Sequence, residues 1–343
     1  MDKTILVTGG AGFIGTNFVN LLYNEYPNCK ILVLDALTYA GDVQHFPDAG
    51  LDSDRFEFWY GNVLDGGIVE HLVSRADYIF HFAAESHVTR SIFDNKHFFE
   101  TDVLGTQSVC YAVSKHRKTV KLFVHISTSE VYGTALTETM DEDHPLNPLS
   151  PYASAKCGAD RLVYSYWSTY QIPAVIIRPF NNYGPYQHLE KVIPRFITSC
   201  ILGESLTVHG DGSAKRDFVH VDDHCRALDM VLHMDPKKLI GEVINIGSGV
   251  DIDIMAIAQL TKSIMKNNDS EIIQIGDRPG QVFRHTCDAT KAKEILDWTP
   301  EITFTDGMKK TVEWYVNNRP SWDAQQWMRQ IPIVNAEGKR EYH

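Results

Sequence analysis

The stretch ILVTGGAGFIG, residues 5–15, decides the fold class of this chain. A short apolar run leads directly into Gly9, Gly12 and Gly15, which are spaced three residues apart, and residues 16–24 then read as a helix. In a strand–turn–helix unit the first glycine permits a tight turn, the second lets the backbone approach a pyrophosphate, and the third lets the helix pack close to the strand. The stretch therefore predicts the first unit of a Rossmann-type dinucleotide-binding fold, with the phosphates at the helix N-terminus.

The next strand supports this interpretation and indicates which dinucleotide binds. It reads LVLDA and ends in Asp35, twenty residues after Gly15. A carboxylate at this place accepts hydrogen bonds from a ribose diol and repels a 2′-phosphate. The sequence therefore predicts NAD rather than NADP as the cofactor.

Further apolar runs predict a doubly wound α/β architecture. Short β-like runs alternate with segments of helical length, which is typical of βαβ units and a parallel sheet. The runs cover residues 4–7, 30–34, 56–60, 78–82, 122–126 and 174–177. After about residue 185 glycines and prolines separate shorter elements, among them strands at 205–209 and 242–246 and helices at 253–266 and 306–317. We therefore predict a Rossmann domain over 1–185 (to which later segments contribute further strands), a smaller C-terminal α/β substrate lobe over 186–320 and a tail over 321–343.

Composition excludes several classes of function. The net charge of −12 argues against binding of nucleic acid, because phosphate backbones are bound by a surplus of Lys and Arg. No apolar run reaches the roughly 18 residues of a membrane span, and no signal peptide is visible at the N-terminus. None of the six cysteines forms a C-x-x-C pair, and His209, His220 and His224 do not have zinc-motif spacing. We expect a cytoplasmic protein without a metal.

The stretch PYASAK holds the most informative pair of side chains. Tyr152 and Lys156 are four residues apart, which places them on one face of a helix. A lysine one turn away lowers the pKa of a tyrosine, which suits Tyr152 to act as a base near neutral pH.

With these motifs the chain resembles the extended short-chain dehydrogenases/reductases that act on nucleotide sugars, and it is most similar to the dTDP-glucose 4,6-dehydratases. The glycine turn and the Tyr/Lys pair are shared by the whole superfamily. More specific to the dehydratase branch are LTYAG (37–41), AAESHV (83–88), NNYGPYQ (181–187) and DRPG (277–280). The resemblance runs almost end to end.

The resemblance implies a role for each matching residue. Tyr152 takes the proton of the sugar 4-hydroxyl, Lys156 holds the nicotinamide ribose, Thr128 lies beside the sugar oxygen, and Glu130 removes the C5 proton. The implied cofactor residues are Gly9, Gly12, Phe13, Ile14, Gly15, Asp35, Asn62, Val63, Ala83, Tyr152 and Lys156. The implied substrate residues are Ser86, His87, Asn181, Lys191, Arg216 and Arg284. Phe283 stands where the branch usually has the first of two adjacent arginines. The set of residues that binds the diphosphate therefore departs from the family pattern here.

The chain departs from the pattern at Ser129, in STSEVYG (127–133). The dehydratase branch usually has an aspartic acid there, which protonates the departing C6 hydroxyl. A serine hydroxyl holds its proton too tightly to be an efficient general acid near neutral pH. The residue that acts as the general acid for elimination in this branch is therefore replaced by Ser129 in this chain.

Four reactions remain open. In the first, Glu130 takes the C5 proton and delivers it to the C6 oxygen, while Ser129 acts as a further catalytic residue that orients the leaving group or a water; the product is a 4-keto-6-deoxy sugar. In the second, hydride returns to C4 and a 5,6-ene sugar forms. In the third, a UDP-glucuronate is oxidised and loses carbon dioxide; STSEVYG also resembles the decarboxylase branch. In the fourth, the protein is a 4-epimerase and Glu130 is idle.

We favour dehydration of a UDP- or dTDP-linked glucose or N-acetylglucosamine, with decarboxylation next. A sensor of nucleotide sugars without catalytic activity is disfavoured, because binding alone needs no acid–base set. Relatives usually form homodimers through two helices per subunit, one of which carries Tyr152. The apolar residues Leu162, Val163 and Trp167 on this helix fit either a dimer interface or the core.

Overall fold

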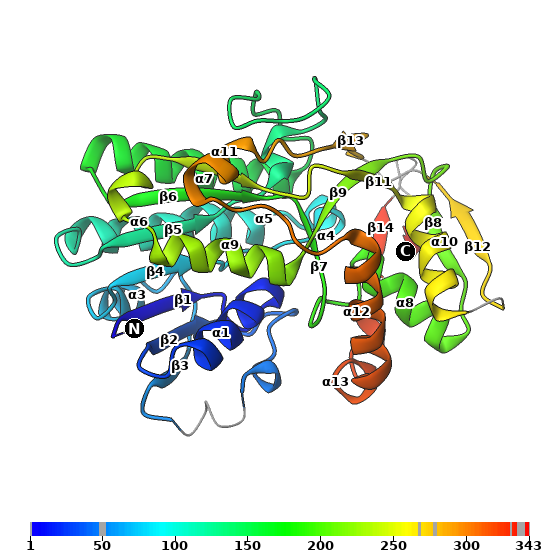
Figure 1. Cartoon of the computed structure of the whole chain (residues 1–343), viewed down its shortest axis with the longest axis horizontal. Helices are drawn as coiled ribbons and strands as arrows, with labels where there is room; N and C mark the ends of the chain where they lie inside the picture. The colour runs from blue at the N-terminus through cyan, green and yellow to red at the C-terminus, as the bar shows by residue number, and fades with distance from the viewer. Residues whose placement is uncertain are drawn as a thin grey trace.

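The computed structural model describes residues 2–47, 53–266, 269–276, 280–329, 331–334 and 340–342, with the backbone alone for 332–334 and 340–342. Within these residues the chain forms a large α/β layer structure with a smaller lobe beside it (Figure 1).

A seven-stranded sheet forms the centre of the larger part. All strand pairs in it are parallel, and their order is β3-β2-β1-β4-β5-β6-β10. The strands are β1 (Thr4–Thr8), β2 (Lys30–Asp35), β3 (Phe56–Tyr60), β4 (Tyr78–His81), β5 (Leu122–Ile126), β6 (Ala174–Pro179) and β10 (Val243–Ile246). From β1 the chain adds β2 and β3 on one side of the sheet and then β4, β5 and β6 on the other. Ligands of open parallel sheets bind at the carboxyl ends of the strands at such a topological switch point. The predicted Rossmann-type fold is confirmed.

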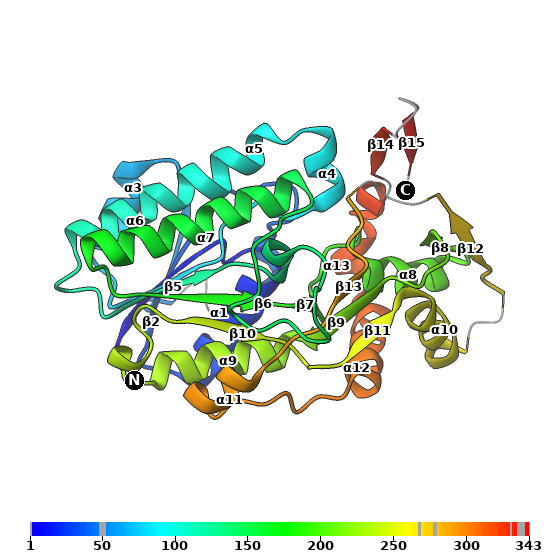
Figure 2. The same cartoon turned by 90° about the horizontal axis from the view of Figure 1, so that it is seen from above.

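Helices cover both faces of this sheet, as Figure 2 shows. One face carries α1 (Phe13–Glu25), α9 (Val221–His233) and α11 (Thr290–Leu296); the other carries α3 (Gly66–Val73), α6 (Thr106–Lys115) and α7 (Pro151–Tyr170). An apolar core lies between the sheet and the helices on each face, because successive side chains of a strand point to opposite faces. Ile5 and Val7 pack in the cluster that includes Phe18 of α1, whereas Leu6 packs in the one that includes Leu72 of α3.

One later segment adds a strand to the main sheet. The run at 242–246 falls in the range 186–320 that was predicted for the smaller lobe, but β10 pairs with β6 as the edge strand of the main sheet, one of the later strands that the Rossmann domain was expected to receive. The intervening helix α9 packs against α1, so the chain returns to the larger part after it has built some of the lobe. Sequence order therefore does not separate the two parts.

The smaller lobe has its own apolar core. It contains α8 (Val192–Leu202), α10 (Ile254–Met265), α12 (Phe304–Asn317) and the parallel pair β8 (Leu206–His209) and β12 (Ile272–Ile275). A second sheet contains β9 (Lys215–His220), β7 (Asn181–Tyr183), β11 (Asp251–Asp253) and β13 (Arg284–His285). Phe196, Ile257 and Tyr315 are fully or almost fully buried between these elements.

The remaining elements are short. They are η1 (Val43–His45), α4 (Val88–Phe93), α5 (Lys96–Phe98), the π-helical turn η2 (Phe99–Gly105), η3 (Ser129–Tyr132), η4 (Pro236–Lys238), α13 (Arg319–Asp323), η5 (Gln326–Arg329), β14 (Pro332–Val334) and β15 (Arg340–Tyr342). The tail returns to the larger part, where β14 contacts α4. Among the helices of the described residues, none has the length and apolar character needed to cross a bilayer.

Candidate active site

A cavity of about 480 Å³ lies at the carboxyl ends of the central strands. One end is formed by the glycine turn after β1, the middle by residues that follow β4 and β5, and the far end by the smaller lobe. The lobe residues include Arg195, Thr207, His209, Arg216 and Phe218. Both parts of the protein therefore line the cavity, and it lies at the strand ends that the topological switch point predicts.

The glycine turn has the geometry that its sequence predicts. Gly9 has φ +72°, and a Cβ there would lie 2.5 Å from the backbone nitrogen of Ala83. A Cβ on Gly15 would collide with the carbonyl oxygen of Gly9. Gly12 is the N-cap of α1 and lines the cavity, so that the N-terminus of a 13-residue helix opens there. At Gly9 and Gly15 only glycine avoids a clash with the neighbouring backbone. The turn leaves room for a phosphate group beside the helix.

Asp35 lies at the same end of the cavity, where the turn holds it. Its Oδ2 accepts a hydrogen bond from the backbone of Ala11 at 2.9 Å, and its Oδ1 accepts one from Leu37 at 2.8 Å. Each carboxylate oxygen can accept more than one hydrogen bond. A fixed carboxylate beside a free helix N-terminus fits the ribose and pyrophosphate of a dinucleotide.

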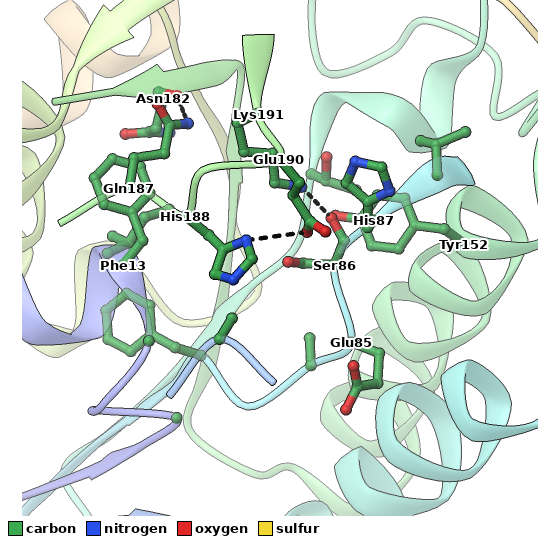
Figure 3. Close-up of a pocket in the computed structure, with 18 of the residues that line it drawn as sticks. Phe13, Glu85, Ser86, His87, Tyr152, Asn182, Gln187, His188, Glu190 and Lys191 are labelled. Carbon is green, nitrogen blue, oxygen red and sulfur yellow. Dashed lines mark hydrogen bonds and ion pairs between the residues drawn. The ribbon is translucent and has the colours of Figure 1, made fainter. Parts of the chain in front are cut away.

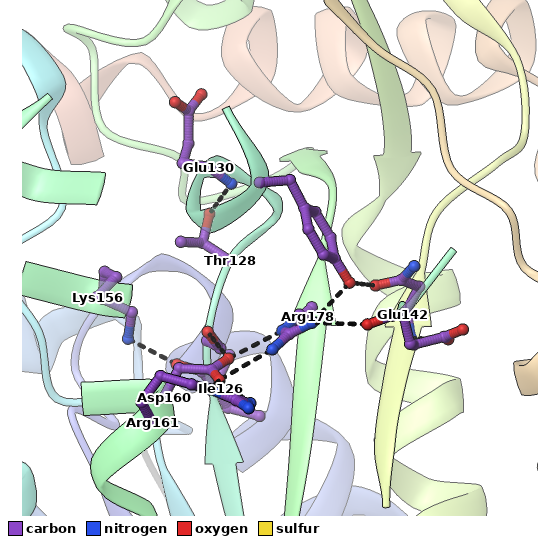
Figure 4. A network of polar contacts seen from close by, with 11 residues as sticks. Ile126, Thr128, Glu130, Glu142, Lys156, Asp160, Arg161 and Arg178 are labelled. Carbon is purple, nitrogen blue, oxygen red and sulfur yellow. Dashed lines mark hydrogen bonds and ion pairs between the residues drawn. The ribbon is translucent and has the colours of Figure 1, made fainter. Parts of the chain in front are cut away.

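Tyr152 and Lys156 lie on α7 and both line the cavity. Lys156 is buried, and its Nζ donates to the carbonyl oxygen of Ile126 at 2.7 Å, at the end of β5 (Figure 4). Tyr152 has a hydrogen bond with Thr128. The α7 helix begins at Ser150, whose hydroxyl accepts from the backbone of Ala153 at 3.1 Å, so the helix start that orients Tyr152 is capped.

One electrostatic expectation for this pair was wrong. Burial, with a further contribution from the negative charge of Asp102, raises the pKa of Tyr152, whereas the sequence predicted that Lys156 lowers it. The ammonium group of Lys156 is directed to Ile126, and burial lowers the pKa of Lys156 itself. In the protein alone the spacing of one helical turn does not make Tyr152 a strong base.

Thr128 and Glu130 also face the cavity, but Ser129 between them does not line it. The Thr128 hydroxyl accepts from the backbone nitrogen of Glu130 at 3.2 Å and caps η3 (Figure 4). Ser129 is buried, and its Oγ lies 3.5 Å from Nδ1 of His285. The turn therefore directs Thr128 and Glu130 to the cavity and directs Ser129, which lies between them, into the protein.

Ser86, His87, Asn181, Lys191 and Arg216 line the cavity together, as do Phe13, Ile14, Asn62, Val63 and Ala83 at the glycine-turn end. Figure 3 shows part of this group: Lys191 donates to the backbone oxygen of Ser86 at 2.6 Å, and the side chains of His188 and Glu190 point towards each other at 3.8 Å. Burial favours a raised pKa for Glu190, but nearby positive groups (His87, Lys191, His188 and Arg90) outweigh it and hold the value at about 2.

Arg284 is not part of this group. Its Nε donates to Asp251 at 2.6 Å and to Thr286 at 3.1 Å, and it does not line the cavity. The DRPG motif cannot be compared in the same way, because residues 277–279 lie outside the described residues. Among the described residues, no group of three or more His, Cys, Asp or Glu side chains has the arrangement of a metal site.

Three residues near the cavity escaped the sequence analysis. The buried carboxylate of Glu190 accepts from Nε of Arg90 at 2.7 Å and from the hydroxyl of Tyr39 at 2.8 Å. Asp102 is buried close to Lys156, and its helical spacing from Phe98 would have placed it on the buried face. Arg329 reaches the cavity from the tail, and no local pattern marks it.

Comparisons with known proteins agree with this geometry. The family model described as GDP-mannose 4,6 dehydratase matches residues 6–311. A dTDP-glucose 4,6-dehydratase of Streptomyces niveus is 41% identical over 93% of this chain and 94% of its own length. The low-salt glycan biosynthesis protein Agl12 of Haloferax volcanii is 44% identical over 92% of this chain and 99% of its own length.

Solved structures give the same result. The dTDP-glucose 4,6-dehydratase DesIV of Streptomyces venezuelae, solved with NAD bound, superimposes with a TM-score of 0.88 at 39% identity and covers 94% of this chain and all of that one. The resemblance inferred from the sequence motifs is confirmed. By its glycine turn, its Tyr/Lys helix and a match over most of its length, the chain belongs to the GDP-mannose 4,6 dehydratase family.

Proposed function

We propose that the protein is an NAD-dependent nucleotide-sugar 4,6-dehydratase that acts on a dTDP- or UDP-linked hexose. One observation carries the proposal: a single cavity brings the glycine turn and Asp35 together with Thr128, Glu130, Tyr152 and Lys156. The relatives named dTDP-glucose 4,6-dehydratase, and the NAD in their structures, support the same reaction and cofactor.

The cofactor end uses backbone groups and one carboxylate. The first turn of α1, which follows its N-cap Gly12, offers backbone N–H groups to the pyrophosphate, and Asp35 accepts from the ribose diol. Lys156, whose Nζ donates to the carbonyl oxygen of Ile126, is the residue that we propose donates to the nicotinamide ribose. NAD, when bound, supplies the chemistry that takes a hydride from the sugar and returns it.

Tyr152 and Thr128 handle the sugar 4-hydroxyl. Tyr152 is the group that takes the hydroxyl proton, and the hydrogen bond from Thr128 orients its phenol. Because burial raises the pKa of Tyr152 in the protein alone, its activation needs positive charge that arrives with the ligands or comes from a rearranged Lys156.

Glu130 then acts at C5 and C6. Once C4 is a ketone the C5 hydrogen is acidic, and the carboxylate of Glu130 removes it as general base. The same carboxyl group, now protonated, gives its proton to the C6 oxygen, which leaves as water. Ser129 is not placed to do so, because it is buried outside the cavity lining.

The nucleotide diphosphate occupies the end of the cavity beside the smaller lobe. Lys191 and Arg216 supply positive charge there, and Asn181 supplies an amide. The guanidinium of Arg216 suits phosphate oxygens. A contribution of Arg284 to diphosphate binding stays a prediction, and it requires Arg284 to leave Asp251.

Decarboxylation of a UDP-glucuronate is the second candidate, because a β-keto acid loses carbon dioxide without an acid at C6. The observation in its favour is that no second carboxyl group lies at position 129. Formation of a 5,6-ene sugar, 4-epimerisation and nucleotide-sugar sensing are further outcomes that one experiment separates.

The test is mass spectrometry of the products after incubation of the purified protein, separately, with dTDP-glucose, UDP-glucose, UDP-N-acetylglucosamine and UDP-glucuronate. Loss of one water from a hexose is the expected result, and deuterium placed at C4 of the substrate should be found at C6 of a 4-keto-6-deoxy product. Loss of carbon dioxide from the glucuronate alone would contradict dehydration, and an unchanged mass with every sugar would leave epimerisation or sensing.

We also infer a cytoplasmic homodimer that forms through η2, α6 and α7. Val163 is buried in the protein's own core and Trp167 packs against it, so of the two alternatives left open by the sequence these two residues belong to the core. Instead Leu104, Tyr111 and Tyr164 are exposed on neighbouring helices. Light scattering of the variant Tyr111→Arg tests the inference: a dimer should become a monomer, and an unchanged mass would contradict this interface.

A further inference from the structure

His285 lies directly beneath the turn that carries Glu130. It comes from β13, which pairs with β9 so that His285 is in register with Arg216. Its side chain is fully buried. Its Nε2 lies 2.6 Å from the carbonyl oxygen of Gly133, and its Nδ1 lies 3.5 Å from Oγ of Ser129 and 4.0 Å from Oε1 of Glu130.

These contacts determine where the imidazole carries its hydrogen. A carbonyl oxygen only accepts hydrogen bonds, so Nε2 must be the protonated nitrogen. In the neutral ring Nδ1 is then an acceptor with a single lone pair, and the Ser129 hydroxyl donates to it while Glu130 is a carboxylate. The hydrogen of Ser129 is thus directed into the protein and away from the sugar.

The surroundings keep the ring neutral. Burial lowers the pKa of His285 to about 4; Glu130 opposes this shift, and Arg216 and His144 reinforce it. The ring itself packs edge-on against Phe180 at 6.3 Å between centroids. At neutral pH a lone pair on Nδ1 therefore faces Ser129 and Glu130.

An acceptor beside a carboxyl group distinguishes between its two states. A lone pair repels a carboxylate oxygen and attracts the hydroxyl of a carboxylic acid. We propose that His285 is a positioning residue for Glu130: between proton removal at C5 and water loss at C6, the hydroxyl of protonated Glu130 takes the place of the Ser129 hydroxyl at the lone pair of Nδ1, which steadies the acid form. The inference rests on the proposed function and names a residue that acts through Glu130.

The proton balance of the two steps is complete. Glu130 takes the proton as the C5–H bond breaks, and the electron pair stays in the enolate of the C4 ketone. The C6–O bond then breaks as the C5–C6 double bond forms, and the proton of Glu130 leaves on the C6 oxygen as water. His285 gains and loses no proton; it only holds the acid form.

Two substitutions separate this role from a structural one. His285→Gln can keep an N–H near the position of Nε2, and hence the contact with Gly133, but it has no nitrogen in the place of Nδ1. His285→Asn can keep a polar group near the position of Nδ1 but does not reach Gly133. Met140→Leu is the control, because Met140 lies in the neighbouring buried cluster to which Phe180 belongs and does not line the cavity.

The measurements use dTDP-glucose, or whichever sugar nucleotide the wild-type protein dehydrates. For His285→Gln we expect kcat to fall by about tenfold or more, with KM changed less than about threefold. The acidic limb of the kcat–pH profile should move to lower pH, because the acid form of Glu130 has lost its acceptor. Exchange of the C5 hydrogen with D2O should fall less than water loss does. His285→Asn should be the more active variant, although its thermal unfolding temperature is lower.

The inference is overturned if His285→Gln keeps the wild-type kcat and pH profile. It is also overturned if His285→Asn is the less active variant and both activities follow thermal stability, since His285 would then serve only to hold the turn at Gly133. Failure of the proposed function looks different, because the wild-type protein would then dehydrate no sugar nucleotide at all.

Discussion

Arg178 and Asp160 form a buried ion pair with two hydrogen bonds of 2.9 Å, one from Nε and one from Nη2 of the guanidinium (Figure 4). The pair joins β6 to α7, the helix that carries Tyr152 and Lys156. Ser127, at the end of β5, also donates to Asp160 at 2.7 Å. This one carboxylate thus links two strands of the sheet to the helix that carries the Tyr/Lys pair.

Asp160→Asn should destabilise the fold by about 3 kcal/mol, because it leaves the charge of Arg178 buried without its partner. Urea unfolding followed by circular dichroism measures the loss. Arg161→Ala is the matched control, since Arg161 contacts the same carboxylate from a partly exposed position and should cost about 1 kcal/mol or less. Equal losses in the two variants would contradict the importance of the buried pair.

The same pair predicts how stability depends on pH. Burial alone would raise the pKa of Asp160, but Arg178 outweighs burial and holds the pKa below its usual range. The folded pKa is therefore lower than the unfolded value of about 3.9. The stabilisation is fully present above pH 4 to 5 and is lost as the pH falls below the unfolded value. In Asp160→Asn the decline of stability between about pH 5 and pH 2 should be shallower than in the wild type.

Glu130→Gln should stop the chemistry at C5 and leave binding of the nucleotide sugar intact. An amide cannot take a proton as a carboxylate does, and loss of a general base costs about 10²- to 10⁴-fold in rate. Deuterium incorporation at C5 from D2O, followed by NMR, measures the step directly. Glu138→Gln, which changes an exposed glutamate of the following loop, is the control. Unchanged exchange in Glu130→Gln would remove Glu130 from its proposed role.

Thr128→Val should lower kcat by about ten- to a hundredfold. The substitution keeps the shape of the side chain but removes the hydroxyl that bonds to Tyr152 and accepts from the backbone of Glu130. Loss of the cap alone costs about 1 kcal/mol of stability, which thermal unfolding reports separately. Thr128→Ser restores the hydroxyl and should recover most of the activity; if it is as slow as Thr128→Val, the hydroxyl is not the operative group.

Ser129→Ala should change kcat by less than about threefold, because the hydroxyl of Ser129 donates to His285 and does not line the cavity. Steady-state kinetics with the sugar nucleotide that the wild type uses provide the measurement. A fall of a hundredfold or more would show that Ser129 reaches the substrate and takes part in proton transfer.

The sequence alone determined the parts of this protein that local chain geometry controls. Gly9 must be glycine because its φ is positive and because the backbone of Ala83, after β4, lies close to it. Such a turn is recognisable from eleven consecutive residues. The spacing of Tyr152 and Lys156 places both on one face of α7 whatever surrounds them. The strands at the centre of the sheet were recognisable for a similar reason, since an uninterrupted apolar run suits a strand covered on both faces.

Only the tertiary structure decided which distant side chains complete the site. Val243–Ile246 joined the main sheet and not the smaller lobe because its partner, β6, lies far back in the chain. Arg329 entered the cavity from the tail, and Ser129 turned towards His285, a residue 156 positions away. Strand pairing and burial bring such residues together through contacts that span the fold, and no periodicity within one segment records them. The environment of Glu130, and hence its chemistry, is therefore a property of the folded chain.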